Sequence, residues 1–306
     1  MEEFSYRVSL EDADERLDKW ISSALQDISR SYIQKLIKDN LVFVNEQPQK
    51  ASYRIKTDDE IRFQIPEAFK PSILEENIPI TILYEDDDIL VVDKPKGMVV
   101  HPAPGHYSGT LVNAVMYHCK DRLSGINGVM RPGIVHRIDK NTTGSIIICK
   151  NDHAHNSIAA QLKEHSITRK YRAIVHGRIA EEEGCIDAPI GRDDKERKKM
   201  AVNEQHGKRA VTHYKVLRAY KEYTYIECQL ETGRTHQIRV HMASIGHPLL
   251  GDEVYGGNRK SRFHTQGQTL HAMTIGFIQP VSGEYIEVSA PLPEYFEKIL
   301  AALEQG

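Results

Sequence analysis

Cysteine is scarce in this chain, and its spacing does not fit a metal site or a disulfide framework. Four cysteines occur in 306 residues, and no two form a Cys-x-x-Cys pair. Zinc-binding modules need closely spaced cysteines, and a disulfide framework needs more cysteines than a chain of this size has here. The sequence therefore argues against both classes. The four are Cys119, Cys149, Cys185 and Cys228.

Long apolar runs and nucleotide-binding motifs are missing as well. No apolar run approaches the roughly 20 residues that span a bilayer. The acidic start Met1-Glu2-Glu3-Phe4 lacks the basic and then apolar order of a signal peptide. No Gly-x-Gly-x-x-Gly or Walker-type loop occurs. We therefore expect a cytoplasmic protein with no membrane segment and no nucleotide cofactor.

Charge of one sign is not in large excess. The formal net charge is -3, so any basic surface for nucleic acid must be local. Hydrophobic residues make up 40% of the chain, which is enough for a globular core. A length of 306 residues suggests two domains, because a domain has roughly 150 residues.

A stretch rich in proline and glutamate, with little periodicity, divides the chain and is typical of a linker. We predict three parts, which are an N-terminal domain over residues 1–66, a linker over 67–79 and a larger domain over 80–306. In the first part, apolar residues recur at helical spacing within 10–25 and again after Ser29, a good helix N-cap. Strand patterns follow at 41–44 and 61–65.

Basic residues gather in this first domain. From residue 16 to residue 56, eight Lys or Arg stand against four Asp or Glu. Such a surplus suits either a solvated helix face or an RNA-binding surface. The arrangement resembles the S4 RNA-binding domain, which implies that Arg30, Lys35 and Lys38 contact RNA. The matching residues are Arg16-Leu17-Asp18, Ser29-Arg30, Gln34, Ile37, Val42-Phe43-Val44-Asn45 and Asp59-Glu60-Ile61.

Two positions depart from the S4 pattern. Asn40 and Glu46 stand where glycine is usual. Asparagine tolerates the left-handed backbone conformation, whereas Glu46 puts a charge at a turn. We expect this charge to weaken a phosphate contact there.

Strands and helices mix irregularly after the linker. Strand patterns occur at 89–92, 145–149, 171–175 and 225–230, and helical patterns follow Thr110 and Asp152. The absence of strict alternation favours a mainly antiparallel sheet over a doubly wound one. The predicted fold class is α+β, with a small S4-like domain followed by a larger domain built on a mixed, mainly antiparallel sheet.

The segment from Gly133 to Gly144 places one acid among cations. Asp139 lies between Arg137 and Lys140, in a loop before an expected strand. Fixed cations favour the ionised carboxylate that a nucleophile or general base requires. The charge pattern alone fits a surface salt-bridge loop better, because perturbed carboxylates are often structural.

A second polar segment begins at a Thr-Gly turn before a helical pattern. Arg234, Gln237 and His241 fall near one helix face, and Arg239 is offset. Donors at a helix start suit a phosphate or the carboxylate of Asp139. A polar helix face without a ligand is the alternative.

The histidines of these segments form no metal-ligand pattern. His136, His236 and His241 lack the spacing of His-Glu-x-x-His, and each has an arginine close by. Cations beside a dication are unfavourable, so we expect no metal site.

His136-Arg137-Ile138-Asp139 closely resembles the His-Arg-Leu-Asp signature of the RluA-type pseudouridine synthases. Ile138 replaces leucine and Asn141 replaces the commoner aspartate. The resemblance runs from about residue 80 to the end, and with the S4-like domain it favours the S4-containing, RluD-like branch. The other matching segments are Asp93-Lys94-Pro95-Lys96-Gly97-Met98, Val100-His101-Pro102, Thr168-Arg169-Lys170-Tyr171-Arg172-Ala173, Thr232 to His241, Gly246-His247-Pro248, Gly251-Asp252, Leu270-His271-Ala272 and Pro291-Leu292-Pro293.

The resemblance implies an isomerase that converts uridine to pseudouridine in RNA without a cofactor. It implies Asp139 as the catalytic carboxylate, Tyr171 as the residue that stacks on the flipped base, and Arg239 as the partner of Asp139. The expected RNA contacts in this domain are Arg137, His136 and Arg234.

The expected RNA is large-subunit ribosomal RNA, and the oligomeric state is left open, with a monomer favoured. One alternative is the same chemistry on transfer RNA. Another is a non-catalytic S4-type RNA-binding or chaperone protein, but the presence of all three implied catalytic residues argues against it. A glycoside hydrolase usually needs two facing carboxylates, and only one acid lies in a chemical motif.

Overall fold

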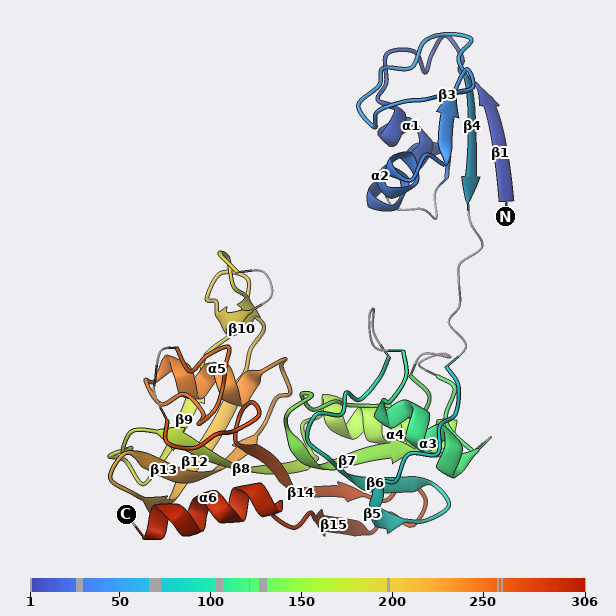
Figure 1. Ribbon diagram of the computed structural model, residues 1–306. Helices are drawn as coiled ribbons and strands as arrows, with labels where there is room; N and C mark the ends of the chain where they lie inside the picture. Colours follow the sequence, from blue (N-terminus) through green and yellow to red (C-terminus); the bar gives the residue numbers. More distant parts are fainter. Residues whose placement is uncertain are drawn as a thin grey trace. The chain divides into compact units, whose positions relative to one another are not determined.

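The computed structural model describes residues 2–25, 30–65, 73–102, 107–120, 122–126, 131–196, 199–257, 259 and 261–305. The chain divides into two compact units, Met1–Pro71 and Ser72–Gly306 (Figure 1). Each unit has a hydrophobic core of its own. No helix in the described ranges is long and apolar enough to cross a membrane.

The described part of the first unit packs two helices against an antiparallel sheet with the strand order β1-β4-β2-β3. Leu17, Ile33 and Phe63 are almost fully buried in its core. The helix expected within 10–25 begins only at Leu17, and Ser29 lies outside the described residues. The elements are β1 (Glu2–Arg7), α1 (Leu17–Ala24), α2 (Arg30–Lys38), β2 (Val42–Val44), β3 (Gln47–Pro48) and β4 (Glu60–Ile65).

A buried carboxylate links the two helices of this unit. The fully buried Asp18 accepts hydrogen bonds from Arg16 Nε (3.0 Å), Arg30 Nε (3.1 Å) and Gln34 Nε2 (2.7 Å). Burial alone favours the neutral acid, but these donors lower the pKa of Asp18 below its usual value. Four of the residues that carry the S4 resemblance, Arg16, Asp18, Arg30 and Gln34, thus form one hydrogen-bonded network.

Both departures from the S4 glycine pattern have left-handed backbone. The φ angle is 54° at Asn40 and 65° at Glu46. Glycine adopts this conformation without a side-chain penalty, which explains why glycine suits both positions. Glu46 is exposed in the turn between β2 and β3.

Among the residues described, the second unit is built on one nine-stranded sheet and a separate two-stranded hairpin of β10 (Ile190–Arg192) and β11 (Met200–Val202). The strand order is β5-β6-β7-β14-β8-β13-β12-β9, with β15 beside β14. The strands are β5 (Thr81–Glu85), β6 (Ile89–Lys94), β7 (Thr143–Cys149), β8 (Thr168–His176), β9 (Glu183–Asp187), β12 (Val211–Ala219), β13 (Tyr223–Leu230), β14 (Leu270–Ile278) and β15 (Tyr285–Ser289).

The strand directions confirm the predicted α+β class. In the described sheet, β7 and β14 pair in parallel, and the other neighbours pair antiparallel. The four predicted strands are all present, and each extends one to three residues beyond the predicted range at one or both ends.

Helices cover both faces of this sheet. In β7, Ile146 shares a core cluster with α3 and Ile147 shares one with α4. In β8, Ala173 shares a cluster with α5 and Ile174 shares one with α6. Because successive strand residues point to opposite faces, α3 and α5 lie on one face, and α4 and α6 on the other. The helices are α3 (Leu111–Cys119), α4 (Asp152–Lys163), α5 (Gln237–Ser244) and α6 (Glu294–Glu304).

Part of the predicted linker is attached to the second unit. Ile73 is 7% exposed in the main core cluster. Asn113 Nδ2 of α3 donates to the carbonyl oxygen of Leu74 (2.7 Å), and the Glu76 N–H donates to the carbonyl oxygen of Asn113 (3.0 Å). Residues 66–72 lie outside the described ranges.

Candidate active site

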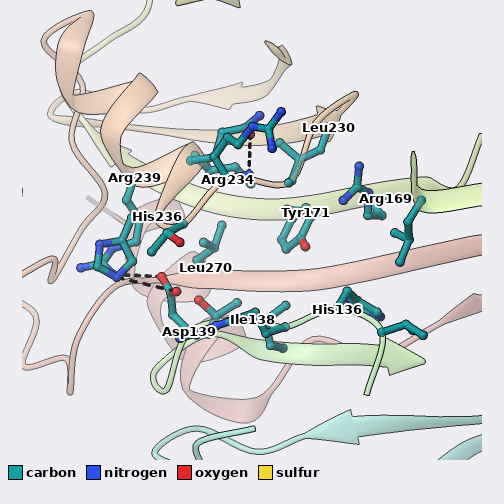
Figure 2. Close-up of a pocket in the computed structure, with 18 of the residues that line it drawn as sticks. His136, Ile138, Asp139, Arg169, Tyr171, Leu230, Arg234, His236, Arg239 and Leu270 are labelled. Atoms are coloured by element: carbon teal, nitrogen blue, oxygen red, sulfur yellow. Dashed lines mark hydrogen bonds and ion pairs between the residues drawn. The ribbon is translucent and has the colours of Figure 1, made fainter. Parts of the chain in front are cut away.

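A pocket of about 520 Å³ gathers side chains from the loop before β7, from β8, from the end of β13 and from the start of α5 (Figure 2). Its apolar lining includes Ile138, Leu230 and Leu270. The pocket brings together the site residues predicted in the second domain. They are Asp139, Tyr171, Arg239, Arg137, His136 and Arg234.

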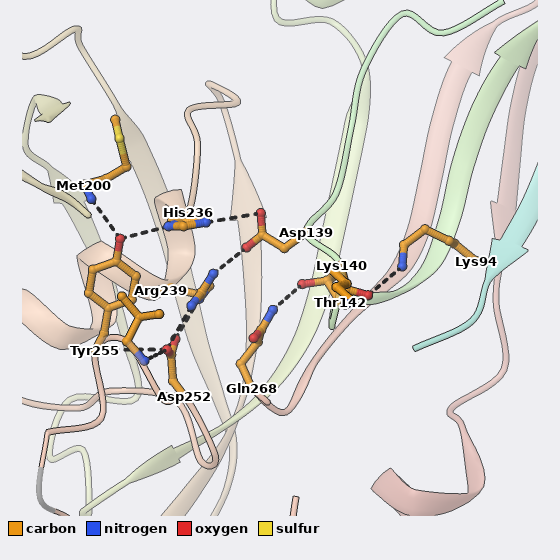
Figure 3. Close-up of polar contacts among 11 residues, drawn as sticks. Lys94, Asp139, Lys140, Thr142, Met200, His236, Arg239, Asp252, Tyr255 and Gln268 are labelled. Carbon is orange, nitrogen blue, oxygen red and sulfur yellow. Dashed lines mark hydrogen bonds and ion pairs between the residues drawn. The ribbon is translucent and has the colours of Figure 1, made fainter. Parts of the chain in front are cut away.

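Buried backbone contacts fix the loop that carries Asp139. Lys94 Nζ is fully buried and donates to three backbone carbonyl groups, one of which is Lys140 (3.1 Å; Figure 3). The Gly97 N–H donates to the same Lys140 oxygen (3.0 Å). Burial lowers the pKa of Lys94 to about 7, although three carbonyl acceptors match the three N–H donors of its protonated amine. The residue after Asp139 is thus tied to the loop after β6.

Gly144 allows β7 to lie against β14. Its φ angle is 109°, and a Cβ at this position would overlap the carbonyl oxygen of Ala272 in β14. The last residue of the signature segment is therefore a glycine for a steric reason. The close pairing brings Leu270, at the start of β14, to the pocket.

A chain of charged groups holds the Asp139 carboxylate. Arg239 Nη1 donates to Asp139 Oδ2 (2.9 Å), while Nε and Nη2 donate to the two oxygens of Asp252 (2.7 and 2.9 Å). Arg239 is 6% exposed. Burial alone disfavours the charged guanidinium, but Asp252 and then Asp139 raise the pKa of Arg239 above its usual value. Arg239 is therefore a fixed cation aimed at one oxygen of Asp139.

His236 lies beside the other oxygen. Its Nε2 is 3.8 Å from Asp139 Oδ1, and its Nδ1 is 2.9 Å from the Tyr255 hydroxyl. The Met200 N–H donates to that hydroxyl oxygen (3.0 Å), which suits a Tyr255 O–H directed at Nδ1. Burial lowers the pKa of His236, so a neutral ring with its proton on Nε2 fits this arrangement.

Tyr171 lies on the pocket face of β8 and is 8% exposed. Figure 2 shows its ring between the Asp139 end of the pocket and the end lined by His136 and Arg169. Burial raises the pKa of Tyr171, so the phenol stays protonated. A flat ring next to Leu230 suits a planar aromatic base.

The three predicted RNA contacts of this domain differ in their surroundings. His136 Nε2 accepts a hydrogen bond from the Ile147 N–H (2.9 Å), and burial lowers its pKa to about 3, so the ring is a neutral acceptor. Arg137 is exposed at the pocket. Arg234 Nε donates to the carbonyl oxygen of Arg209 (3.0 Å).

Three residues at and just before α5, namely Arg234, Gln237 and His241, were predicted as donors to a phosphate or to Asp139. This prediction is wrong for Gln237 and His241. Gln237 Nε2 donates to the carbonyl oxygen of Val211 (2.9 Å), and the buried His241 ring contacts Thr212 and Ala188. Both side chains are directed at β12 and at Ala188, because this face of α5 packs against that part of the domain. The offset Arg239 is the residue that reaches Asp139.

In the first unit, Lys35 and Lys38 are exposed on α2, as an RNA contact requires. The Arg30 side chain is 47% exposed and forms an ion pair with Asp18. The sequence prediction gave no role to Lys94, Asp252, Tyr255 or Arg169. The only available signal was the family motif in which three of them lie.

A family model described as RNA pseudouridylate synthase matches residues 88–244, and one described as S4 domain matches residues 15–61. The chain belongs to the RNA pseudouridylate synthase family. It is therefore an isomerase that acts on RNA and carries an S4 domain, as the resemblance implied.

Relatives with the same activity in their names match over nearly the whole chain. The identity is 52% to the RNA pseudouridine synthase YlyB of Bacillus subtilis, over 100% of both chains. It is 46% to the ribosomal large subunit pseudouridine synthase D of Zymomonas mobilis, over 94% of this chain and 93% of that one. The solved structure of human RNA pseudouridylate synthase domain containing 1 matches with a TM-score of 0.57 at 25% identity, over 76% of this chain and 97% of that one.

Proposed function

We propose that this pseudouridine synthase modifies uridines of large-subunit ribosomal RNA, and that Asp139 is its catalytic carboxylate. Two relatives named ribosomal large subunit pseudouridine synthase D support the substrate. They are the proteins of Zymomonas mobilis, at 46% identity, and Neisseria meningitidis, at 42% identity over 306 residues. A cytoplasmic location is part of the same proposal.

The reaction breaks the bond between ribose C1′ and uracil N1 and joins C1′ to C5. Inside a stacked RNA the reacting atoms are covered, so the uridine must flip into a pocket. A pocket of about 520 Å³ is large enough for one nucleoside. Its apolar walls are suited to the base, and in this proposal Asp139 acts on the ribose.

The observation that carries the proposal is the fixed carboxylate of Asp139. Its side chain is 18% exposed, and its Oδ2 is held by Arg239, which is itself held by Asp252. A preorganised ionised carboxylate serves two chemical routes. It attacks C1′ directly, or it removes the C2′ proton to give a glycal. The arrangement suits both routes.

Other residues complete the proposed site. Tyr171 stacks on the flipped base, and its protonated hydroxyl lies near the position of C5. Arg137 and Arg234 contact phosphates at the pocket entrance. In the first unit, Lys35 and Lys38 supply salt-dependent phosphate contacts that help to select the RNA region.

The test incubates the purified protein with unmodified large-subunit ribosomal RNA and maps pseudouridine chemically. We expect the parent protein to form pseudouridine at defined sites and Asp139→Asn to form none, because the amide cannot act as a nucleophile or base. Asp87→Asn is the matched control, since Asp87 is exposed and lies outside the pocket. It should retain full activity.

Other outcomes separate the parts of the proposal. Equal product from the parent and Asp139→Asn removes Asp139 from the mechanism. Product on transfer RNA but not on ribosomal RNA overturns the substrate. Tight binding to ribosomal RNA without product from any variant contradicts catalysis on that RNA.

A further inference from the structure

The pocket contains a buried guanidinium to which the proposed site gives no role. Arg169 is 7% exposed and lines the pocket. It lies two residues before Tyr171 in β8, and alternate residues of a strand share a face. Both side chains are therefore on the pocket side of the strand, with Tyr171 nearer to Asp139 (Figure 2).

This guanidinium has no carboxylate partner in the described parts of the chain. Its Nη2 donates to the carbonyl oxygen of Glu231 (2.9 Å). Its Nε is buried and has no hydrogen-bond partner among the described residues. A buried cation with an unused donor is costly unless a ligand completes its contacts. Burial accordingly lowers the pKa of Arg169.

A glycine leaves room for this side chain. A Cβ at Gly233 would lie 2.7 Å from Arg169 Nη1. The guanidinium therefore occupies the space beside Gly233 and is held there by the Glu231 carbonyl group. Its position is fixed by the turn after β13, and the residue lines the pocket from there.

The chemistry of an RNA substrate indicates which group reaches Arg169. The target nucleotide stays joined to the RNA on both sides, so its phosphates remain at the pocket entrance, where Arg137 and Lys163 are exposed. Only the base and ribose enter. A side chain as buried as Arg169 therefore meets the base, whose hydrogen-bond acceptors are the carbonyl oxygens O2 and O4.

On the basis of the proposed function, we propose that Arg169 is a further catalytic residue that donates a hydrogen bond to a carbonyl oxygen of the flipped uracil. When the C1′–N1 bond breaks, its electron pair stays with the base, and the negative charge is shared by N1, O2 and O4. C5 then forms the new bond to C1′, the C5 proton leaves, and N1 takes up a proton. Arg169 stabilises the anion between these two bond changes.

The test compares Arg169→Met and Arg169→Lys with the parent enzyme in single-turnover assays on a ribosomal RNA fragment that contains a mapped target uridine. A buried donor to developing charge contributes about 10²- to 10³-fold in rate. We expect a loss of this size for Arg169→Met and a smaller loss for Arg169→Lys, which keeps the cation. The Kd for RNA should change less than about 3-fold, because RNA affinity is dominated by phosphate contacts.

Lys170→Met is the matched control, because Lys170 is the next residue in β8, on the opposite face, and lies outside the pocket lining. It should keep the parent rate. Gly233→Ala gives an independent test, since the added methyl group must displace the end of the Arg169 side chain. Like Arg169→Met, it should lower the single-turnover rate, and it should leave the thermal melting curve unchanged.

A modified substrate tests the role in base departure. Fluorine at C5 stabilises the departing base anion, so an RNA with 5-fluorouridine at the target needs less help to break its C1′–N1 bond. C5 of this nucleotide carries no proton to lose, so pseudouridine cannot form and the rate followed on both RNAs is the disappearance of the starting nucleotide. We expect Arg169→Met to lose at least 10-fold less of this rate on the 5-fluorouridine RNA than on the uridine RNA. An equal loss on both substrates, or a loss of RNA affinity with an unchanged rate, overturns the inference. An inactive parent would instead contradict the proposed function.

Discussion

Arg239 is directed at Asp139 because three of its donors are fixed at once. Two bind Asp252, whose side chain is fully buried, and the third binds Asp139. Asp252 Oδ1 also accepts the N–H groups of Val254 and Tyr255 (3.0 and 3.1 Å), so its own position is set by backbone. Asp252 is thus a positioning residue that acts through Arg239.

We expect Asp252→Asn to lower the single-turnover rate about 10²-fold, which corresponds to about 2.7 kcal/mol of transition-state stabilisation. The amide offers one acceptor oxygen where the carboxylate offers two, so the bidentate contact to Arg239 is lost. The Kd for RNA should stay constant. Asp187→Asn, at an exposed residue of β9, is the control. An unchanged rate for Asp252→Asn would show that Arg239 holds its position without this carboxylate.

Individual residues of the pocket could be predicted from the sequence where they lie within a short family motif. Asp139 and Tyr171 each lie within a short signature, and the pocket contains both. Arg239 and Asp139 are 100 residues apart, so their pairing came from the family resemblance and not from spacing. Asp252 binds Arg239 because the loop after α5 folds back onto that helix. No local sequence pattern predicts this contact.

At the scale of elements, the close pairing of β7 and β14 depends on Gly144. We expect Gly144→Ala to destabilise the second unit by more than about 3 kcal/mol, since the methyl group meets the Ala272 carbonyl and the residue has a positive φ angle. Urea unfolding measures this loss. Gly125→Ala is the control, because no atom lies within 4 Å of a Cβ there, and its effect should stay within about 0.5 kcal/mol. Equal stability of the two variants would contradict the steric argument.

Elements with strong apolar periodicity were predicted well. All four predicted strands of the second unit have at least five buried residues, because β-branched and aliphatic runs identify central strands. Strand β1 was missed, since Glu2 and Glu3 begin it and its pairing with β4 is decided by tertiary contacts. The donor face of α5 was assigned wrongly because periodicity does not say which partner a helix face packs on.

At the scale of the whole molecule, the S4 domain and the isomerase domain form separate units. Removal of residues 1–66 should leave the second unit folded, because its core clusters contain no residue of the first. We expect the truncated enzyme to bind ribosomal RNA more weakly, with a shallower dependence of affinity on salt and a looser choice of sites. Filter binding at several salt concentrations and pseudouridine mapping measure both effects.

The matched control for this truncation is the double variant Lys35→Gln/Lys38→Gln in the full chain. It removes two exposed cations of α2 and leaves the Asp18 network intact. It should reproduce part of the change in salt dependence. Unchanged salt dependence and site choice in the truncated enzyme would remove the first unit from RNA recognition.

The two-part organisation and the fold class were within reach of the sequence, because each domain carries several motifs in order. The order in which the strands of the larger domain pair could not be predicted from the sequence. Strand β14 is near the C-terminal end of the chain, yet it lies between β7 and β8, which come more than 90 residues earlier. That insertion is a long-range pairing, which local patterns do not specify.

The central place of β14 has a consequence for the order of events during synthesis on the ribosome. Asp139 precedes β7 and Tyr171 belongs to β8, and the strand that joins these two parts of the sheet is translated only at residues 270–278. A nascent chain that ends before this point has both residues but no sheet to bring them together. The two parts of the pocket are therefore joined only after residues 270–278 have been made, and we expect a nascent chain that stops before β14 to lack the assembled pocket.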